Sequence, residues 1–195
     1  MKRETVRVVV ASVMMLAFLG LVSCASAPKT EVQKDEVQAS IRDMAAQSLG
    51  QLYKANPAAQ GVVTNATGYA VFSDFGFKLM VMGGVRGKGI AINNATKQET
   101  FMEMMELQPG YGLGTRKFRA VMIFDTPAAY NKFVTSGWEF GVDAMAAAKT
   151  RTEGGALAGA ATLSEGVHMY QITEEGLIVG VSVTGAKYYK DKDLN

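Results

Sequence analysis

Hydrophobic and polar residues recur along this chain with two periods, which divide it into a helical part and a strand-rich part. Residues 35–54 carry apolar side chains at every third or fourth position, the spacing of an amphipathic helix. Asn56 and Pro57 predict its end. Two arrangements stay open for this helix, because its apolar side either packs on a sheet or lies on lipid. Its polar side holds few basic residues, Arg42 and Lys54, which favours packing on a sheet.

β-Branched, aromatic and glycine residues become frequent after this helix and predict short strands. The expected strands are residues 69–72, 78–85, 89–92, 96–107, 118–124, 167–173 and 177–184. Turns are expected at residues 73–76, at Gly87, at Asn93–Asn94 and at residues 174–176. The turn at residues 174–176 joins the last two strands as a hairpin.

One short helix interrupts the strands. Thr126 is its expected N-cap, Pro127 takes the first helical position, and Gly137 ends it. One long helix, many short strands and one inserted helix predict an α+β domain built on antiparallel sheet. All but Gly20 and Gly50 of the 21 glycines lie in the strand-rich part. Glycine within strands marks bends and close approaches, so we expect a strongly curved sheet, barrel-like and partly closed.

The first 23 residues predict a secretory signal peptide, because a basic start precedes the uncharged and mostly apolar residues 8–23. This stretch is shorter than the roughly 20 residues that a membrane-spanning helix needs. It ends in residues 21–24, Leu-Val-Ser-Cys, which resemble a bacterial lipobox. Cys24, the single cysteine of the chain, is therefore the expected lipidation site.

The segment after Cys24 predicts how the domain is attached. Ala25 follows the cysteine, where an Asp would indicate retention in the inner membrane, so we expect an outer-membrane lipoprotein facing the periplasm. Residues 24–34 are small and polar and predict a lipidated, flexible tether, which leaves residues 35–195 as the domain. Removing residues 1–23 takes away three of 20 basic and one of 18 acidic residues, so 17 of each remain.

Composition excludes several classes of function. One cysteine excludes a disulfide framework, and one histidine excludes a site of several histidines on a metal. The balanced charge argues against a nucleic-acid binder. His168 alternates with apolar neighbours in an expected strand, which favours a structural role over catalysis. We therefore expect no enzyme activity, no cofactor and no metal.

Residues 101–107 are rich in methionine and leave two interpretations. Thioethers bind Cu(I), which is handled in the periplasm. Met102 and Met104 would share one face of a strand, however, and methionine is also a flexible core residue. The pattern favours a place in the core or in the lining of a lipid cavity.

Two glycine-rich segments, residues 83–89 and 110–119, contain the basic residues that are candidates for phosphate binding. Glycine lets backbone N–H groups approach an anion, and arginine binds phosphate with two hydrogen bonds. Neither segment matches a P-loop or a dinucleotide fingerprint. The candidate headgroup-binding residues are Arg86, Lys88, Arg116, Lys117 and Arg119. If these segments are strands, Arg86 and Lys88 share a face, and so do Lys117 and Arg119. The alternative is that these residues are solvated strand ends.

The same segments resemble the SYLF-domain family of lipid-binding, actin-patch-related proteins. The segments that carry the resemblance are residues 68–72, 83–89, 110–114, 120–124, 133–144 and 176–185. The resemblance covers about residues 35–189 and implies a lipid-binding module. Eukaryotic members bind phosphoinositides, partly through an N-terminal amphipathic segment, and fungal members bind actin filaments. Bacterial members are commonly exported lipoproteins.

These observations predict a non-enzymatic lipoprotein that is held in the outer membrane by its acyl chains and binds phospholipid through its SYLF-like domain. Actin is absent from a bacterial periplasm, so actin binding is not expected to transfer. The alternative is a structural or adaptor protein of the envelope that binds a protein partner. Its contact surface would include Trp138, Phe140 and Tyr188–Tyr189.

Overall fold

The computed structural model describes residues 30–79, 82–109, 114–116, 118–140, 159–173, 176–178 and 186–195. By their internal contacts, residues 1–30 and 31–195 form separate units, and the second unit contains the described helices and strands. The expected signal peptide and Cys24 lie outside the described residues.

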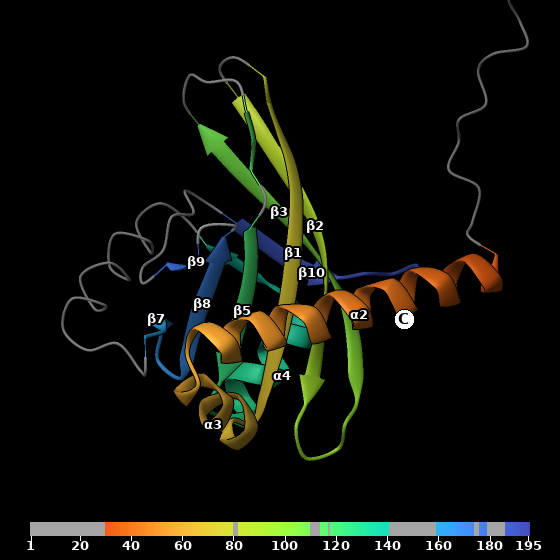
Figure 1. The fold of residues 1–195 in the computed structure, drawn as a ribbon. Coiled ribbons are helices and arrows are strands. Elements are labelled where there is room, and N and C mark those ends of the chain that lie inside the picture. Colours follow the sequence, from red (N-terminus) through yellow and green to blue (C-terminus); the bar gives the residue numbers. More distant parts are fainter. Residues whose placement is uncertain are drawn as a thin grey trace, which may run out of the picture. The chain divides into compact units, whose positions relative to one another are not determined.

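Within the described residues, ten strands form one sheet. They are β1 (Gly68–Leu79), β2 (Met82–Asn93), β3 (Glu99–Pro109), β4 (Gly114–Arg116), β5 (Phe118–Phe124), β6 (Trp138–Phe140), β7 (Ala161–Ser164), β8 (Val167–Thr173), β9 (Gly176–Ile178) and β10 (Ala186–Lys190). Their order is β6-β10-β3-β2-β1-β5-β8-β7, with β4 beside β1 and β9 beside β8 (Figure 1). The described pairs are antiparallel, and the sheet curls into a half-barrel, which confirms the predicted α+β class.

The long helix, α2 (Glu31–Ala55), packs on this sheet, as its weakly basic polar side predicts. Ile41 and Leu52 of the helix are buried against strand residues such as Val71 and Val121. Figure 1 shows α2 crossing in front of the strands. The helix begins at Glu31, so residues 31–34, which the pattern assigns to the tether, are helical.

A second helix, α3 (Ala58–Asn65), has no counterpart in the sequence prediction. Its eight residues are too few to show an apolar period in a window of about 11–18 residues. Its end is held by a distant side chain, because Asn94 Nδ2 donates to the carbonyl oxygens of Val63 at 2.7 Å and Ala66 at 2.8 Å.

Local signals correctly predicted the third helix, α4 (Pro127–Ser136). Thr126 Oγ1 accepts the N–H of Ala129 at 3.2 Å, and Gly137 ends the helix with a φ of 73°. This helix covers the face opposite α2, where Phe72, Phe133 and Tyr188 form an aromatic cluster. The sheet is therefore covered by helices on both faces.

Two predicted turns are wrong. β1 runs without interruption through residues 73–76, and β2 runs through Gly87. The two strands pair over twelve positions, from Gly68 opposite Asn93 to Leu79 opposite Met82. The cross-strand pairing satisfies the backbone groups of these polar and glycine residues, so it outweighs their local preference for turns.

Glycine inside β2 marks a close approach rather than a strand end. A Cβ atom at Gly89 would overlap the ring of Phe72 on the neighbouring strand. The turn expected at Asn93–Asn94 is confirmed, because Asn93 Oδ1 accepts the N–H groups of Ala95 and Thr96. The strands on either side of the second expected turn, β8 and β9, pair antiparallel as the predicted hairpin requires, and residues 174–175 lie outside the described residues.

Candidate functional site

A row of polar residues crosses four neighbouring strands on the face that α2 covers. Ser73 of β1 pairs with Lys88 of β2 on one side and with Arg119 of β5 on the other. Lys88 pairs in turn with Glu103 of β3. Directly opposed residues in neighbouring strands point to the same face. The fold thus brings one basic residue from each glycine-rich segment together, about 10 Å apart across the strands.

Lys88 is held by two carboxylates. Its Nζ donates to Glu103 Oε1 at 3.0 Å and to Asp191 Oδ2, whose side chain is 1% exposed. Burial alone would lower the pKa of Lys88, but the hydrogen bonds to Asp191 and Glu103 outweigh it and raise the pKa. Lys88 is therefore charged, and it faces two carboxylates of the protein, which more than compensate its single positive charge.

Asp191 links this pair to the turn that follows β10. Its Oδ1 accepts the N–H groups of Asp193 at 2.9 Å and Leu194 at 3.2 Å. Burial alone would raise the pKa of Asp191, but the hydrogen bonds from Lys88 and from these two N–H groups lower it overall. The sequence did not indicate this carboxylate, because it lies 103 positions from Lys88.

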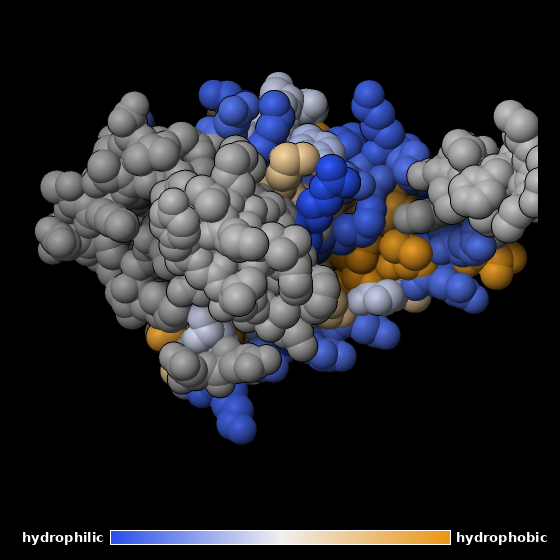
Figure 2. All heavy atoms as spheres, turned by 90° about the horizontal axis from the view of Figure 1, so that it is seen from above, coloured by the Kyte–Doolittle hydropathy of each residue, from blue (hydrophilic) through white to orange (hydrophobic). Residues whose placement is uncertain are grey.

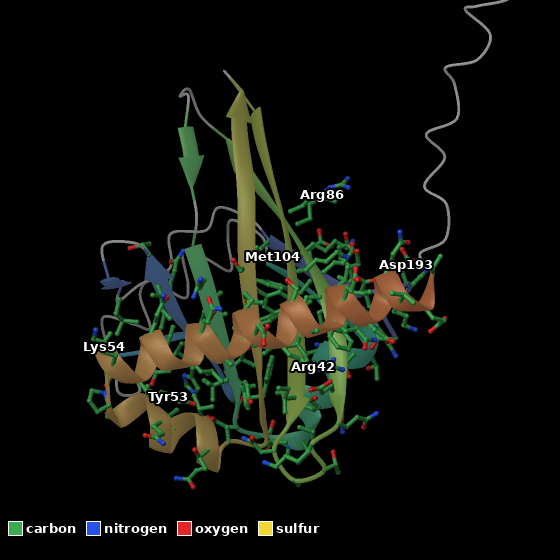
Figure 3. The ribbon with its side chains drawn as sticks, turned by 45° about the vertical axis from the view of Figure 1, so that its right-hand side comes forward. Arg42, Tyr53, Lys54, Arg86, Met104 and Asp193 are labelled. Carbon is green, nitrogen blue, oxygen red and sulfur yellow. The ribbon has the colours of Figure 1, made fainter. Side chains whose placement is uncertain are left out.

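The turn also contacts the first half of α2. Gln38 Nε2 donates to the carbonyl oxygen of Leu194 at 2.8 Å, and Leu194 is fully buried. The side chain of Asn195 pairs with both backbone groups of Phe101 in β3, at 3.0 and 2.9 Å. Asp191 and its turn therefore fix α2, β2 and β3 to one another (Figure 3 places Asp193 beside the start of α2).

Arg86 and Arg119 differ from Lys88 in their surroundings. Arg86 shares a face with Lys88, as the strand period predicts, but it is exposed and takes part in no ion pair among the described residues. Figure 3 shows it extending away from α2. Arg119 is half-buried and donates from Nη1 to Gln51 Oε1 of α2 at 3.1 Å.

The remaining predicted residues have no described side chains. Arg116 belongs to β4, which pairs with β1 opposite Gly76. Lys117 and Cys24 lie outside the described residues altogether. The shared face of Lys117 and Arg119 therefore stays a prediction.

A groove of about 350 Å³ runs between α2 and the polar row. On the α2 side, the apolar Val37, Ile41 and Met44 line it together with Glu36 and Ser40, and Ser73 and Lys88 form its polar floor. Figure 2, viewed from above Figure 1, shows hydrophobic surface between hydrophilic side chains on this side of the domain. A groove with apolar side chains and a polar floor suits an amphiphile better than a free ion.

Other residues that the sequence singles out have structural contacts. His168 bridges two segments, because its Nε2 lies 2.9 Å from Asp125 Oδ2 and its Nδ1 lies 3.1 Å from Thr162 Oγ1. In the neutral ring, Nε2 donates to the carboxylate and Nδ1 accepts the hydroxyl proton. Met102 and Met104 are buried in the core beside α4, which agrees with the interpretation of the methionines as core residues.

Of the four aromatic residues in the contact surface of the adaptor alternative, the structure removes Tyr188, whereas Trp138 and Tyr189 keep part of their surface exposed. Tyr188 is 3% exposed and packs with its ring centroid 4.9 Å from that of Phe72. Trp138 is half-buried against the same core cluster, and the side chain of Phe140 lies outside the described residues. Tyr188 is therefore a core residue, because its side chain lies on the face of β10 that packs in the cluster beside α4.

No helix in the described part of the chain is long and apolar enough to cross a membrane. Within the same residues, no group of three or more His, Cys, Asp or Glu side chains is placed to hold a metal ion.

A curled antiparallel sheet between an N-terminal helix and an inserted helix defines the class of this domain, and sequence comparison identifies the family. Residues 105–195 match the family described as Ysc84, Las17-binding protein actin regulator. Residues 105–195 therefore carry a domain of the Ysc84, or SYLF-domain, family.

A relative from Aeromonas veronii, Beta cell expansion factor A, is 34% identical to this chain over 173 residues. The alignment covers 86% of this chain and 61% of the relative. The chain thus spans about three-fifths of the length of the relative that it matches.

Proposed function

We propose that this protein is an exported lipoprotein, anchored through Cys24 in the outer membrane, whose SYLF domain binds phospholipid from the periplasmic side without a catalytic step. The observation that carries the proposal is the groove beside α2, where Val37, Ile41 and Met44 face Lys88 and the exposed Arg86 lies on the same face of β2. Apolar side chains in the groove, and an exposed arginine further along the same face of β2 that has no ion pair among the described residues, match the two parts of an anionic lipid.

The short segment between Cys24 and α2 supports binding of the groove to the membrane in which the protein is anchored. Glu31, the first residue of α2, is the seventh residue after Cys24. Seven residues span at most about 25 Å when fully extended. An acylated Cys24 would keep Glu31 within that distance of the bilayer, and Glu36, where the groove begins, lies about 7.5 Å further along the helix.

The candidate headgroup-binding residues have different surroundings, so they take different roles in this proposal. Lys88 is paired with two carboxylates, Glu103 and Asp191, so in this proposal it orders the floor of the groove and does not bind the phosphate. Arg86 is exposed and contacts the lipid phosphate, and Arg119 lies at the β5 end of the polar row. Each cation near an anionic membrane surface contributes about 1 kcal/mol to binding.

Vesicle flotation of the mature chain carrying Cys24→Ser tests this assignment without the acyl anchor. We expect Arg86→Gln to weaken binding to vesicles containing phosphatidylglycerol about five-fold, which corresponds to about 1 kcal/mol. The matched control is Lys54→Gln, which removes the same charge at the far end of α2 (Figure 3). Equal effects of the two substitutions would show that binding reads only net charge and would refute the groove as the site.

A further inference from the structure

A second cavity, of about 360 Å³, lies between α4 and the turn that joins β7 to β8. Phe124, Phe133 and Val167 in its wall belong to the core cluster beside α4, whereas the groove described above adjoins the cluster under α2. The two sites therefore open on opposite faces of the sheet. Phe124 ends β5 and Val167 begins β8, so this cavity lies at one end of the half-barrel, where these two strands end and begin.

The deep wall of this cavity is apolar and aromatic. Phe124, Phe133 and Val167 are at most 5% exposed, and Trp138 packs beside them while remaining partly exposed. Ligand cavities in proteins range from about 300 to 1,000 Å³. A volume near the lower end accommodates one acyl chain, whereas a phospholipid with two chains is too large.

The open side carries charged side chains. Lys132 lies on the same face of α4 as Ala128 and Ala129, because residues three and four apart are neighbours on a helix. A lysine in this position lays its methylene stem along an apolar wall and keeps its ammonium group at the mouth. Glu165 lines the cavity from the turn after β7, and no ion pair joins it to Lys132 among the described residues.

We propose that this cavity binds an amphiphile with a single acyl chain and a carboxylate head, of the class of free fatty acids. The chain lies against Ala128, Ala129 and Trp138, which keep exposed surface in the cavity, and the carboxylate pairs with Lys132 at the mouth. Glu165 faces solvent from an exposed turn and disfavours a second negative charge on the ligand. This site is independent of the phospholipid groove, because none of its lining residues belongs to that groove.

Trp138 gives a direct readout, because it is the single tryptophan of the chain and lines the cavity. The probe is stearic acid carrying bromine on carbons 9 and 10, titrated below its critical micelle concentration into the mature Cys24→Ser protein. Bromine quenches tryptophan fluorescence only at short range. We expect saturable quenching, which unbrominated stearic acid reverses by competition.

Two substitutions locate the site. Ala128→Phe fills the cavity and is expected to abolish saturable quenching. Ala58→Phe is its matched control, because each exposed alanine directly follows a proline in the first turn of a helix, and only Ala128 lines the cavity. Quenching that is unchanged in the Ala128→Phe protein would overturn the assignment, and thermal unfolding by circular dichroism checks that both variants fold.

The head group is tested separately. Lys132→Gln is expected to weaken binding of the brominated acid about two- to five-fold, as for an exposed ion pair, and to leave binding of the corresponding brominated alcohol unchanged. Equal affinity of acid and alcohol for the wild-type protein would refute the carboxylate assignment. Stronger quenching by brominated phospholipid vesicles, again dependent on Ala128, would assign the cavity to phospholipid instead. Neither result bears on flotation, which depends on Arg86.

Discussion

We expect removal of the ion pair between Lys88 and Asp191 to lower the free energy of unfolding of the domain. Removing one partner of a buried pair costs about 3–5 kcal/mol. Here Lys88 is 37% exposed and keeps Glu103, so the penalty is smaller. We expect Asp191→Asn to lower the free energy of unfolding by about 2 kcal/mol, because an amide oxygen still accepts the two N–H groups of the turn.

Asp191→Ala removes the hydrogen-bond acceptor as well as the charge. The buried N–H group of Leu194 and the part-buried N–H group of Asp193 then lose their partner, so the expected loss grows to about 3 kcal/mol. Asp193→Asn is the control, because this exposed carboxylate of the same turn has no ion pair among the described residues. Its expected effect is within about 0.5 kcal/mol.

Urea unfolding followed by the fluorescence of Trp138 measures these values, because β6, which begins at Trp138, pairs with β10 just before Asp191. A double-mutant cycle with Lys88→Met isolates the pair from its surroundings. We expect a coupling energy above about 1 kcal/mol between the two positions. If the double variant loses the simple sum of the two single losses, the pair does not stabilise the domain as described.

The same pair predicts a dependence of stability on pH. The pKa of Asp191 is lowered, so its contribution is present above its ordinary value of 3.8 and is lost as pH falls through the folded-state pKa. The pKa of Lys88 is raised, so its contribution is present below 10.5 and is lost as pH rises through the folded-state pKa. The stability difference between wild type and Asp191→Asn should therefore shrink at both extremes, as urea titrations at pH 3, 7 and 11 would show.

Three further predictions concern separate parts of the chain. Burial raises the pKa of Tyr130 to about 12 from 10.0, so its neutral phenol stabilises the fold below pH 10, and this contribution is lost as pH rises to 12. Tyr130→Phe should therefore reduce the loss of stability between pH 10 and 12. An unchanged dependence of the unfolding free energy on pH would contradict this. Gly89→Ala should destabilise by about 1–3 kcal/mol because its Cβ overlaps Phe72, and a neutral effect in urea unfolding would show that the ring moves freely. Cys24→Ala in the full chain should release the protein from the membrane fraction, and a membrane-bound protein of mature size would refute the lipid anchor.

Elements with strong local signals were predictable from the sequence. The N-cap at Thr126, Pro127 at the first helical position and Gly137 at the end fix α4 within its own segment. The apolar period fixed α2, although not its first turn, because residues 31–34 carry too few apolar side chains to show the period. The aliphatic run of β5 was bounded to the residue.

The long hairpin of β1 and β2 was not predictable in this way. Ser73, Asp74 and Gly76 have local preferences for turns, and twelve cross-strand pairs override them. The ion pairing of Lys88 was hidden for the same reason, since Asp191 is near it only in the folded chain. Sequence named Arg86, Lys88 and Arg119 as candidates but could not separate the paired residue from the exposed one.

Flotation of the mature Cys24→Ser protein with vesicles of phosphatidylglycerol, compared with vesicles of phosphatidylcholine, is the most direct test of the central claim. At moderate salt the screening length is about 8 Å, so only charges close to the lipid contribute. The account predicts that the protein floats with the anionic vesicles and that Arg86→Gln reduces the bound fraction. Equal flotation with both kinds of vesicle, or none with either, would contradict it.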